Sequence, residues 1–244
     1  MKRQPDAPDI LFEDESLLAL NKPDGLLISP DRWDKDLPNL MRYVHEHISP
    51  KYFNAHRLDK DTSGVVLCAK NKKTLDTLCA YFEERQVEKH YLAITQGVPK
   101  EEFFTVSRPI TNDDRFPGRM KLSEHGKPCE TNFQTLEKWR GYALVRATPL
   151  TGRTHQIRLH LAAAECPIIA DRYYGYGRGL MLSEIKKHYK EGKKPERPLI
   201  GRLALHAESM KFNHPVTGEP VTITAPLPHD FELALKYLRR FAGF

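Results

Sequence analysis

Residues 56–69 join two patterns that few folds can hold side by side. The first nine residues, which we call the polar loop, read HRLDKDTSG and contain two carboxylates, two cations, two hydroxyls and a glycine. The next five read VVLCA, an apolar run with strong β propensity. The charged part suits neither a helix nor a core strand, so we predict a loop anchored by a buried strand. Polar side chains on such a loop are typical of catalytic or binding sites.

Apolar runs and turn signals along the rest of the chain predict more strands than helices. The expected strands cover residues 10–12, 17–20, 65–69, 88–97, 130–137, 142–149, 168–170, 202–207, 209–212 and 221–225. Residues 202–207 and 209–212 form either two strands or one bent strand. The expected helices cover residues 40–48, 71–82 with Asn71 as cap, 154–164, part of 181–189 and the C-terminal end. The turn-rich residues 107–128 predict a long, exposed basic loop, with or without a short strand. Hairpin-linked strands that outnumber helices indicate an α+β fold with a largely antiparallel, twisted sheet.

The chain has 244 residues, enough for one large domain or two small ones. No linker separates two apolar regions, so we predict a flexible tail over residues 1–9 and a single domain over 10–244. The formal net charge of +6 favours a polyanionic partner, most often a nucleic acid, although many enzymes are mildly basic.

The four cysteines argue against both a disulfide framework and a zinc site, because none of them forms a CxxC pair. We expect reduced thiols, as in a cytoplasmic protein. The N-terminus lacks the apolar centre of a signal peptide, and no run of about 18 apolar residues occurs. The sequence therefore predicts a cytoplasmic protein that neither binds a metal nor enters a membrane.

Four further blocks accompany the polar loop. Residues 21–25, 89–93, 151–160 and 203–207 read NKPDG, KHYLA, TGRTHQIRLH and LALHA. In family order, the five blocks resemble the NKPxG, HRLDxxTSG, KxYxA, TGRxHQIRxH and LxLHA motifs of the RluA-type RNA pseudouridine synthases, which include the tRNA-modifying TruC branch.

The resemblance implies the pseudouridine synthase catalytic fold, a large, bent, mostly antiparallel mixed sheet flanked by helices and crossed by an RNA-binding cleft. Many members carry a small extra RNA-binding domain before the NKPxG block. Only about twenty residues precede that block here, so we expect that domain to be missing. Target choice would then depend on the catalytic domain and its loops.

The implied activity is the isomerisation of a uridine in structured RNA, rRNA or tRNA, to pseudouridine. The reaction neither gains nor loses atoms, so no cofactor or metal is expected. Asp59 is the expected nucleophile, and the resemblance implies that Arg153 keeps it ionised by a salt bridge, because burial alone would raise its pKa. Attack on the sugar, attack on carbon 6 of the base and removal of a ribose proton to give a glycal all stay open. Asp61 falls at a variable position of the motif and receives no catalytic part.

The resemblance also implies three contacts with the target base. Tyr91 would stack on the uracil and help to remove the proton from carbon 5, and Leu205 would pack on the other side. Arg57 would fill the gap that the base leaves when it is flipped out of the RNA. His56 is expected to hold the polar loop and to transfer no proton.

Other basic residues are expected to bind or support the RNA. Lys22 and Lys89 would line the edge of the cleft, and Arg158 and His160 would support the site or touch a backbone phosphate. Residues 172–198 form the most basic stretch, which would either bind RNA phosphates or remain a solvated loop.

Two other functions compete with this prediction. One is an RNA-binding or RNA-chaperone module of the same fold that needs no catalysis, although the complete set of Asp59, Tyr91 and Arg153 argues against it. The other is a nucleoside hydrolase, which would have to admit water to the site. The sequence specifies neither the RNA nor the uridine, and a monomer is the expected state.

Overall fold

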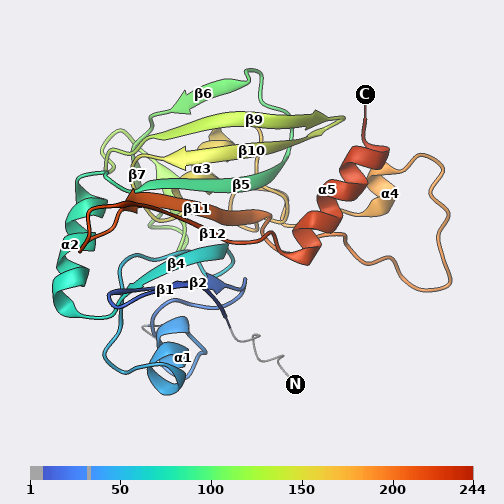
Figure 1. Cartoon of the computed structure of the whole chain (residues 1–244). Helices are drawn as coiled ribbons and strands as arrows, with labels where there is room; N and C mark the ends of the chain where they lie inside the picture. Colours follow the sequence, from blue (N-terminus) through green and yellow to red (C-terminus); the bar gives the residue numbers. More distant parts are fainter. Residues whose placement is uncertain (1–7, 32–33, 244) are drawn as a thin grey trace. The chain divides into compact units, whose positions relative to one another are not determined.

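The computed structural model describes residues 8–31 and 34–243 (Figure 1). Most of the expected tail, residues 1–7, lies outside the described residues. The chain forms two compact units, the first made of Met1–His90 and His206–Pro226 and the second of Tyr91–Leu205 and Leu227–Phe244. The single domain expected over residues 10–244 stays a prediction.

The first unit is a mixed sheet centred on one strand. Its elements are β1 (Asp9–Glu13), β2 (Leu17–Lys22), α1 (Leu40–His47), β3 (Phe53–Asn54), β4 (Ser63–Ala69), α2 (Lys72–Glu83), the start of β5 (Glu88–Gln96), most of β11 (Leu205–Asn213) and β12 (Pro220–Thr224). Strand β2 pairs antiparallel with β4 from Gly64 to Ala69, and β1 extends the sheet beyond β2. The other edge of β4 pairs in parallel with β11 at its start and antiparallel with β3 at its end. Strand β12 pairs antiparallel with β11.

Gly64 shows why the polar loop ends in a glycine. Its φ of +114° lies in the left-handed region, which side chains disfavour. It also lies opposite Ala207 in the parallel β4–β11 pair, where an added Cβ would collide with the Ala207 carbonyl oxygen. The strand that anchors the loop therefore requires a residue without a side chain at this position.

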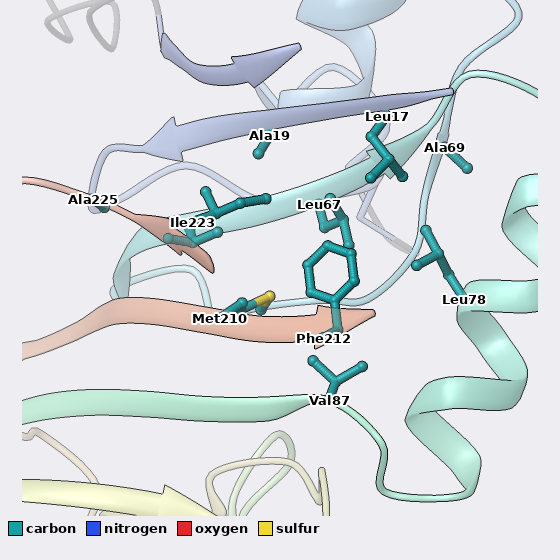
Figure 2. Packing of buried hydrophobic residues seen from close by; sticks show 11 residues of the cluster. Leu17, Ala19, Leu67, Ala69, Leu78, Val87, Met210, Phe212, Ile223 and Ala225 are labelled. Carbon is teal, nitrogen blue, oxygen red and sulfur yellow. The ribbon is translucent and has the colours of Figure 1, made fainter. Parts of the chain in front are cut away.

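The core of the first unit joins the sheet to α2. Figure 2 shows Leu67 of β4, Leu78 of α2 and Phe212 of β11 packed in one cluster of buried apolar residues. The helix begins where predicted, because the Asn71 side chain accepts a hydrogen bond from the Thr74 N–H. This packing fixes the strand that follows the polar loop and leaves the loop at the start of that strand.

The second unit contains an antiparallel sheet, a separate hairpin and three helices. Its elements are the rest of β5, β6 (Phe103–Val106), β7 (Ile110–Asn112), β8 (Met120–Leu122), β9 (Thr131–Trp139), β10 (Tyr142–Pro149), α3 (Gln156–Ala163), α4 (Leu182–Ile185) and α5 (His229–Phe241). The sheet order is β5-β10-β9-β6, and β7 pairs with β8. Helix α3 contacts β8, β9 and β10, and its Leu159 packs on Ile110 and Cys129. Helices α4 and α5 lie side by side (Figure 1).

The predicted α+β class with mostly antiparallel strands is confirmed, but one local prediction is wrong. Residues 168–170 form one bridge, between Ile168 and Thr95, and no strand. The helix expected in part of 181–189 is present as α4. Residues 107–128 contain two short strands, the β7–β8 hairpin, because the buried Ile110 gives this charged stretch an apolar anchor. The bent sheet with a central cleft stays a prediction.

Within the part of the chain that the structure describes, no helix combines the length and apolarity needed to span a bilayer. Among the same residues, no three His, Cys, Asp or Glu side chains form a group that could hold a metal ion.

Candidate active site

The expected site residues are divided between the two units. The first unit contains Lys22, Arg57, Asp59 and Lys89, and the second contains Tyr91, Arg153, Arg158, His160 and Leu205. The Asp59–Arg153 ion pair therefore stays a prediction. Within each unit, the structure separates side chains that are held by their neighbours from side chains that reach the surface.

In the first unit, the polar loop presents charges on a buried frame. Arg57 is exposed and Asp59 is partly exposed, whereas Thr62 and Ser63 are buried. The Thr62 N–H donates to the Asp59 carbonyl at 3.1 Å, which closes a turn around the carboxylate. Ser63 Oγ lies 3.0 Å from Nδ1 of the fully buried His206. Hydroxyl residues thus fix the loop, while Arg57 is exposed and Asp59 keeps part of its surface exposed.

His56 holds the polar loop at its other end. Its Nε2 accepts a hydrogen bond from the Leu67 N–H at 3.0 Å, and its ring packs on Phe82 at 5.2 Å between centroids. Burial, together with a smaller contribution from the nearby Lys89, lowers the pKa of His56 to about 3. The ring is therefore a neutral, fixed acceptor, which is the holding role expected of it. Lys89 lies 5.9 Å from the Phe82 ring centroid, and burial lowers its pKa.

Lys22 is buried inside the first unit. Its ammonium group donates to the carbonyl oxygens of Pro23 and Leu26 at 2.8 Å and to that of Lys60 at 2.9 Å. Because Lys60 belongs to the polar loop, Lys22 ties the NKPDG turn to that loop. Sequence reasoning missed this internal role, and contact of Lys22 with RNA stays a prediction.

In the second unit, the turn before α3 wraps around one buried amide. Gln156 Oε1 accepts hydrogen bonds from Thr151 Oγ1 at 2.7 Å and from the Arg153 N–H at 3.0 Å. Its Nε2 donates to the Glu130 carbonyl and to Thr131 Oγ1, both at 2.9 Å. Every hydrogen-bonding position of the amide is thus occupied. The backbone of Arg153 is held rigidly, while its side chain is exposed.

His160 continues this network from Thr131. The Thr131 hydroxyl bonds Nδ1 of His160 at 3.0 Å, and Nε2 lies 3.1 Å from the Arg108 carbonyl oxygen. Because a carbonyl can only accept, we assign the ring proton to Nε2. Burial lowers the pKa of His160, which favours the neutral ring. With both nitrogens bonded and no exposed surface, His160 supports the site from within, and its contact with substrate stays a prediction.

Arg158 fastens a second turn to α3. Its Nε and Nη2 donate to the two carboxylate oxygens of Asp171 at 2.8 and 2.9 Å. Both side chains are almost completely buried. Burial raises the pKa of Asp171, but the Arg158 guanidinium and the N–H groups of Tyr173 and Tyr174 outweigh it and leave that pKa below its ordinary value. The guanidinium is thus paired within the protein, and its contact with a phosphate stays a prediction.

Tyr91 and Leu205 are the residues at which the chain enters and leaves the second unit. Tyr91 lies opposite Ala147 in the β5–β10 pair and is 9% exposed, and Leu205 is 3% exposed. Both are largely buried, so the stacking of either residue on a uracil stays a prediction.

One Ser–His–Asp cluster lies outside the five blocks. His214 Nε2 is 3.1 Å from Ser16 Oγ and 2.8 Å from Asp14 Oδ2, so both partners share one ring nitrogen. The other nitrogen accepts from the N–H groups of Val216 and Thr217. A hydrolase triad uses opposite nitrogens for the serine and the carboxylate. This cluster therefore pins two turns together and has no triad geometry.

Comparison with known proteins agrees with the five blocks. The sequence pattern of the family described as RNA pseudouridylate synthase matches residues 16–163. Ribosomal large subunit pseudouridine synthase C of Pasteurella multocida is 38% identical over 240 residues, which cover 94% of this chain and 68% of that protein. Ribosomal large subunit pseudouridine synthase D of Xanthomonas campestris is 33% identical over 235 residues, which cover 95% and 69%.

Two solved human structures resemble the whole fold. RNA Pseudouridylate Synthase Domain Containing 1 superposes with a TM-score of 0.72 at 28% identity, covering 93% of this chain and 87% of that chain. RNA Pseudouridylate Synthase Domain Containing 4 gives 0.69 at 29% identity, with coverage of 94% and 92%.

The fold and the sequence blocks together define an RNA-modifying isomerase. The chain belongs to the RNA pseudouridylate synthase family, in its RluA-type branch, and converts uridine in RNA to pseudouridine.

Proposed function

We propose that the chain isomerises one specific uridine in a structured RNA, with Asp59 as nucleophile and Arg153 as its ionic partner. The observation that carries this proposal is the difference in burial between residues of the polar loop. Thr62 and Ser63 are buried and hydrogen-bonded, whereas Asp59, in the turn that the Thr62 N–H closes, is partly exposed. A reacting group needs a rigid support of this kind.

In the proposed reaction, the target nucleotide leaves the RNA stack at a cost of a few kcal/mol, and Arg57 occupies the space it leaves. Asp59 assists cleavage of the bond between N1 and the anomeric carbon. The freed uracil turns between Tyr91 and Leu205, and carbon 5 bonds to the anomeric carbon. Carbon 5 loses its proton and N1 gains one, so the atoms balance. Attack on the sugar, attack on carbon 6 and a glycal route are all compatible with this placement.

The relatives' names point to a first substrate to test. Several relatives are named as synthases of the ribosomal large subunit, so we propose rRNA as the first candidate and tRNA as the second. We also propose that the protein works in the cytoplasm as a monomer.

The test measures tritium release from rRNA and tRNA that carry tritium at carbon 5 of uridine. We expect Asp59→Asn to lower the rate by about 10⁴-fold, as loss of a nucleophile does. Asp61→Asn, which removes an exposed carboxylate two residues away, is the matched control and should keep the wild-type rate. Equal release by wild type and Asp59→Asn would overturn the assignment.

The same experiment distinguishes the competing functions. An RNA chaperone predicts that Asp59→Asn restores a deletion strain fully, and a hydrolase predicts free uracil as product. Mapping carbodiimide-modified uridines in RNA from the deletion strain would identify the RNA and the uridine.

A further inference from the structure

The second unit has a pocket outside the blocks that define the family. Its volume is about 470 Å³, within the usual range for ligand sites. It is formed by the chain that follows α4 and by one face of α5. The lining combines two aromatic rings, Tyr189 and Tyr237, with three cations, Lys193, Lys194 and Arg197.

The segment that forms the pocket is fixed at its base. Leu180 and Ile200 pair in an antiparallel bridge, and the Leu180 N–H donates to the Ile200 carbonyl at 3.0 Å. Gly179 allows this close approach, because an added Cβ would collide with the Ile200 carbonyl oxygen. Glu196 Oε1 accepts from the Ser183 N–H at 2.8 Å, which ties the far side of the segment back to α4.

The charges and rings of the pocket select the chemistry of its ligand. Residues 186–197 contain six cations against two carboxylates, and Lys193, Lys194 and Arg197 are exposed. Tyr237 stacks on Phe241 with 5.8 Å between centroids, which fixes the orientation of its ring. Cations beside aromatic rings are the combination that binds unstacked nucleotides, through phosphate neutralisation and base stacking.

The pocket lies at the end of the second unit's sheet that is remote from Tyr91. The turn between β9 and β10 is tied to the end of α5, because the Arg140 N–H donates to the Ala242 carbonyl at 2.8 Å (Figure 1). Tyr91 lies opposite Ala147, five positions along β10 from its first residue. At about 3.3 Å per residue, this corresponds to about 17 Å along the strand. A nucleotide in the pocket is therefore not the one that reacts.

We propose that this pocket binds an unstacked nucleotide of the substrate RNA, away from the reacting uridine. Lys193, Lys194 and Arg197 neutralise its phosphates, and Tyr189 or Tyr237 stacks on its base. The proposal rests on the proposed function for the identity of the ligand as substrate RNA. Its effect is on RNA affinity and its salt dependence.

The test measures the binding of fluorescein-labelled decauridylate by anisotropy over a range of potassium chloride concentrations. The pocket variant is Lys193→Ala/Lys194→Ala/Arg197→Ala. The matched control is Lys51→Ala/Lys72→Ala/Lys73→Ala, which removes three exposed lysines of the first unit. We expect the pocket variant to weaken binding at least about tenfold and to lower the slope of log Kd against log salt by about two, since each lost contact to a single strand contributes about 0.7. The control should change neither quantity.

Two further variants, Tyr189→Leu and Tyr237→Leu, test the stacking directly. The variant that lacks the stacking ring should weaken decauridylate binding at least about fivefold with an unchanged salt slope, because a stacked base contributes affinity without releasing counterions. Unchanged affinity in Tyr189→Leu and Tyr237→Leu would overturn stacking. Equal slope changes in the pocket variant and the lysine control would show a general electrostatic attraction to RNA and overturn the pocket as a site. The pocket would also be overturned as an RNA site if its variant lost binding to an acidic protein but kept its affinity for decauridylate.

Tritium release measured in parallel separates this proposal from the proposed function. We expect the KM for the tritiated RNA to rise in the pocket variant by about the factor seen in binding. A wild-type protein that binds decauridylate but releases no tritium would overturn the proposed function alone. Tritium release and binding that are both unaffected in the pocket variant would overturn the pocket alone.

Discussion

The polar loop and helix α3 both carry a family block, but they use their polar side chains in opposite ways. In the loop, Arg57 is exposed and Asp59 partly exposed, supported by buried hydroxyl residues. In α3, the residues Gln156, Arg158 and His160 are 4%, 4% and 0% exposed, and their side chains are bonded to other parts of the second unit. Residue type alone does not distinguish a residue that is available to a substrate from one that supports the fold, whereas burial and hydrogen bonding do.

The comparison leads to a simple expectation for mutations. Substitutions of Arg57 or Asp59 in the polar loop should lower the reaction rate and leave the free energy of unfolding almost unchanged. Substitutions of the buried α3 side chains should first lower that free energy. Three experiments, from the largest expected effect to the smallest, test where the division lies.

The largest effect is expected at the buried ion pair of α3. Arg158→Leu leaves the Asp171 carboxylate buried without its cation, which should lower the free energy of unfolding by about 3–5 kcal/mol. Arg153→Leu removes an exposed arginine five residues earlier and should change it by less than about 0.5 kcal/mol. Urea unfolding followed by circular dichroism measures both values. Equal losses in the two variants would remove the distinction between them.

The same pair has a defined pH dependence. The pKa of Asp171 is lower in the folded protein than its ordinary value of about 3.9. Its contribution to stability is therefore fully present above pH 4 or so, and is lost as the pH falls through the lower, folded pKa. Arg158→Leu should flatten this acid-side loss.

The strands were predictable because their signals are local. Apolar runs beside turn residues indicated the 10–20 hairpin and the β9–β10 pair, and the chain forms both. The single bridge at Ile168 looked like a strand because an apolar triplet does not reveal how many partners it will find. For residues 107–128 the sequence indicated at most one short strand and not the β7–β8 pair, because the many charged residues there obscure the buried Ile110.

The polar part of the candidate site was less predictable, because its interactions are not local in sequence. A lysine in a turn is usually exposed, and Lys22 is buried only because carbonyl groups from two segments converge on its ammonium group. Gln156 stood inside a recognised block, yet its role depends on Thr131, the first residue of β9, and on Glu130, which precedes it. Whether such a residue is buried depends on partners that are distant in sequence. Composition and motif spacing do not predict these partners.

A smaller effect, but one that links stability to rate, is expected at Gln156. Gln156→Leu keeps the side-chain volume but removes the partners of the Arg153 N–H and the Glu130 carbonyl, which should cost about 2–3 kcal/mol of unfolding free energy. Because Arg153 then loses its fixed backbone, the rate of tritium release per folded molecule should also fall. Gln86→Leu, at an exposed position, is the control. A folded variant with normal stability and reduced rate would instead make Gln156 a participant in the chemistry.

The smallest effect, when it is counted per pH unit, is a pH dependence of stability that belongs to the polar loop. The pKa of His56 in the folded protein is about 3, below the ordinary value near 6.5. Between these values the unfolded chain binds the proton and the folded one does not, so stability is complete above pH 6.5 and falls on acidification. The slope from this group is at most about 1.4 kcal/mol per pH unit.

His56→Gln tests this slope, because a glutamine oxygen can still accept the Leu67 N–H but does not titrate. The variant should show a shallower loss of stability between pH 6.5 and 3 than the wild type, measured by urea unfolding at each pH. His125→Gln, at an exposed histidine, should keep the wild-type slope. If His56→Gln also kept that slope, the ring would gain its proton within the folded loop. The polar loop would then contain a titrating group beside Asp59, and its frame would no longer be separate from its chemistry.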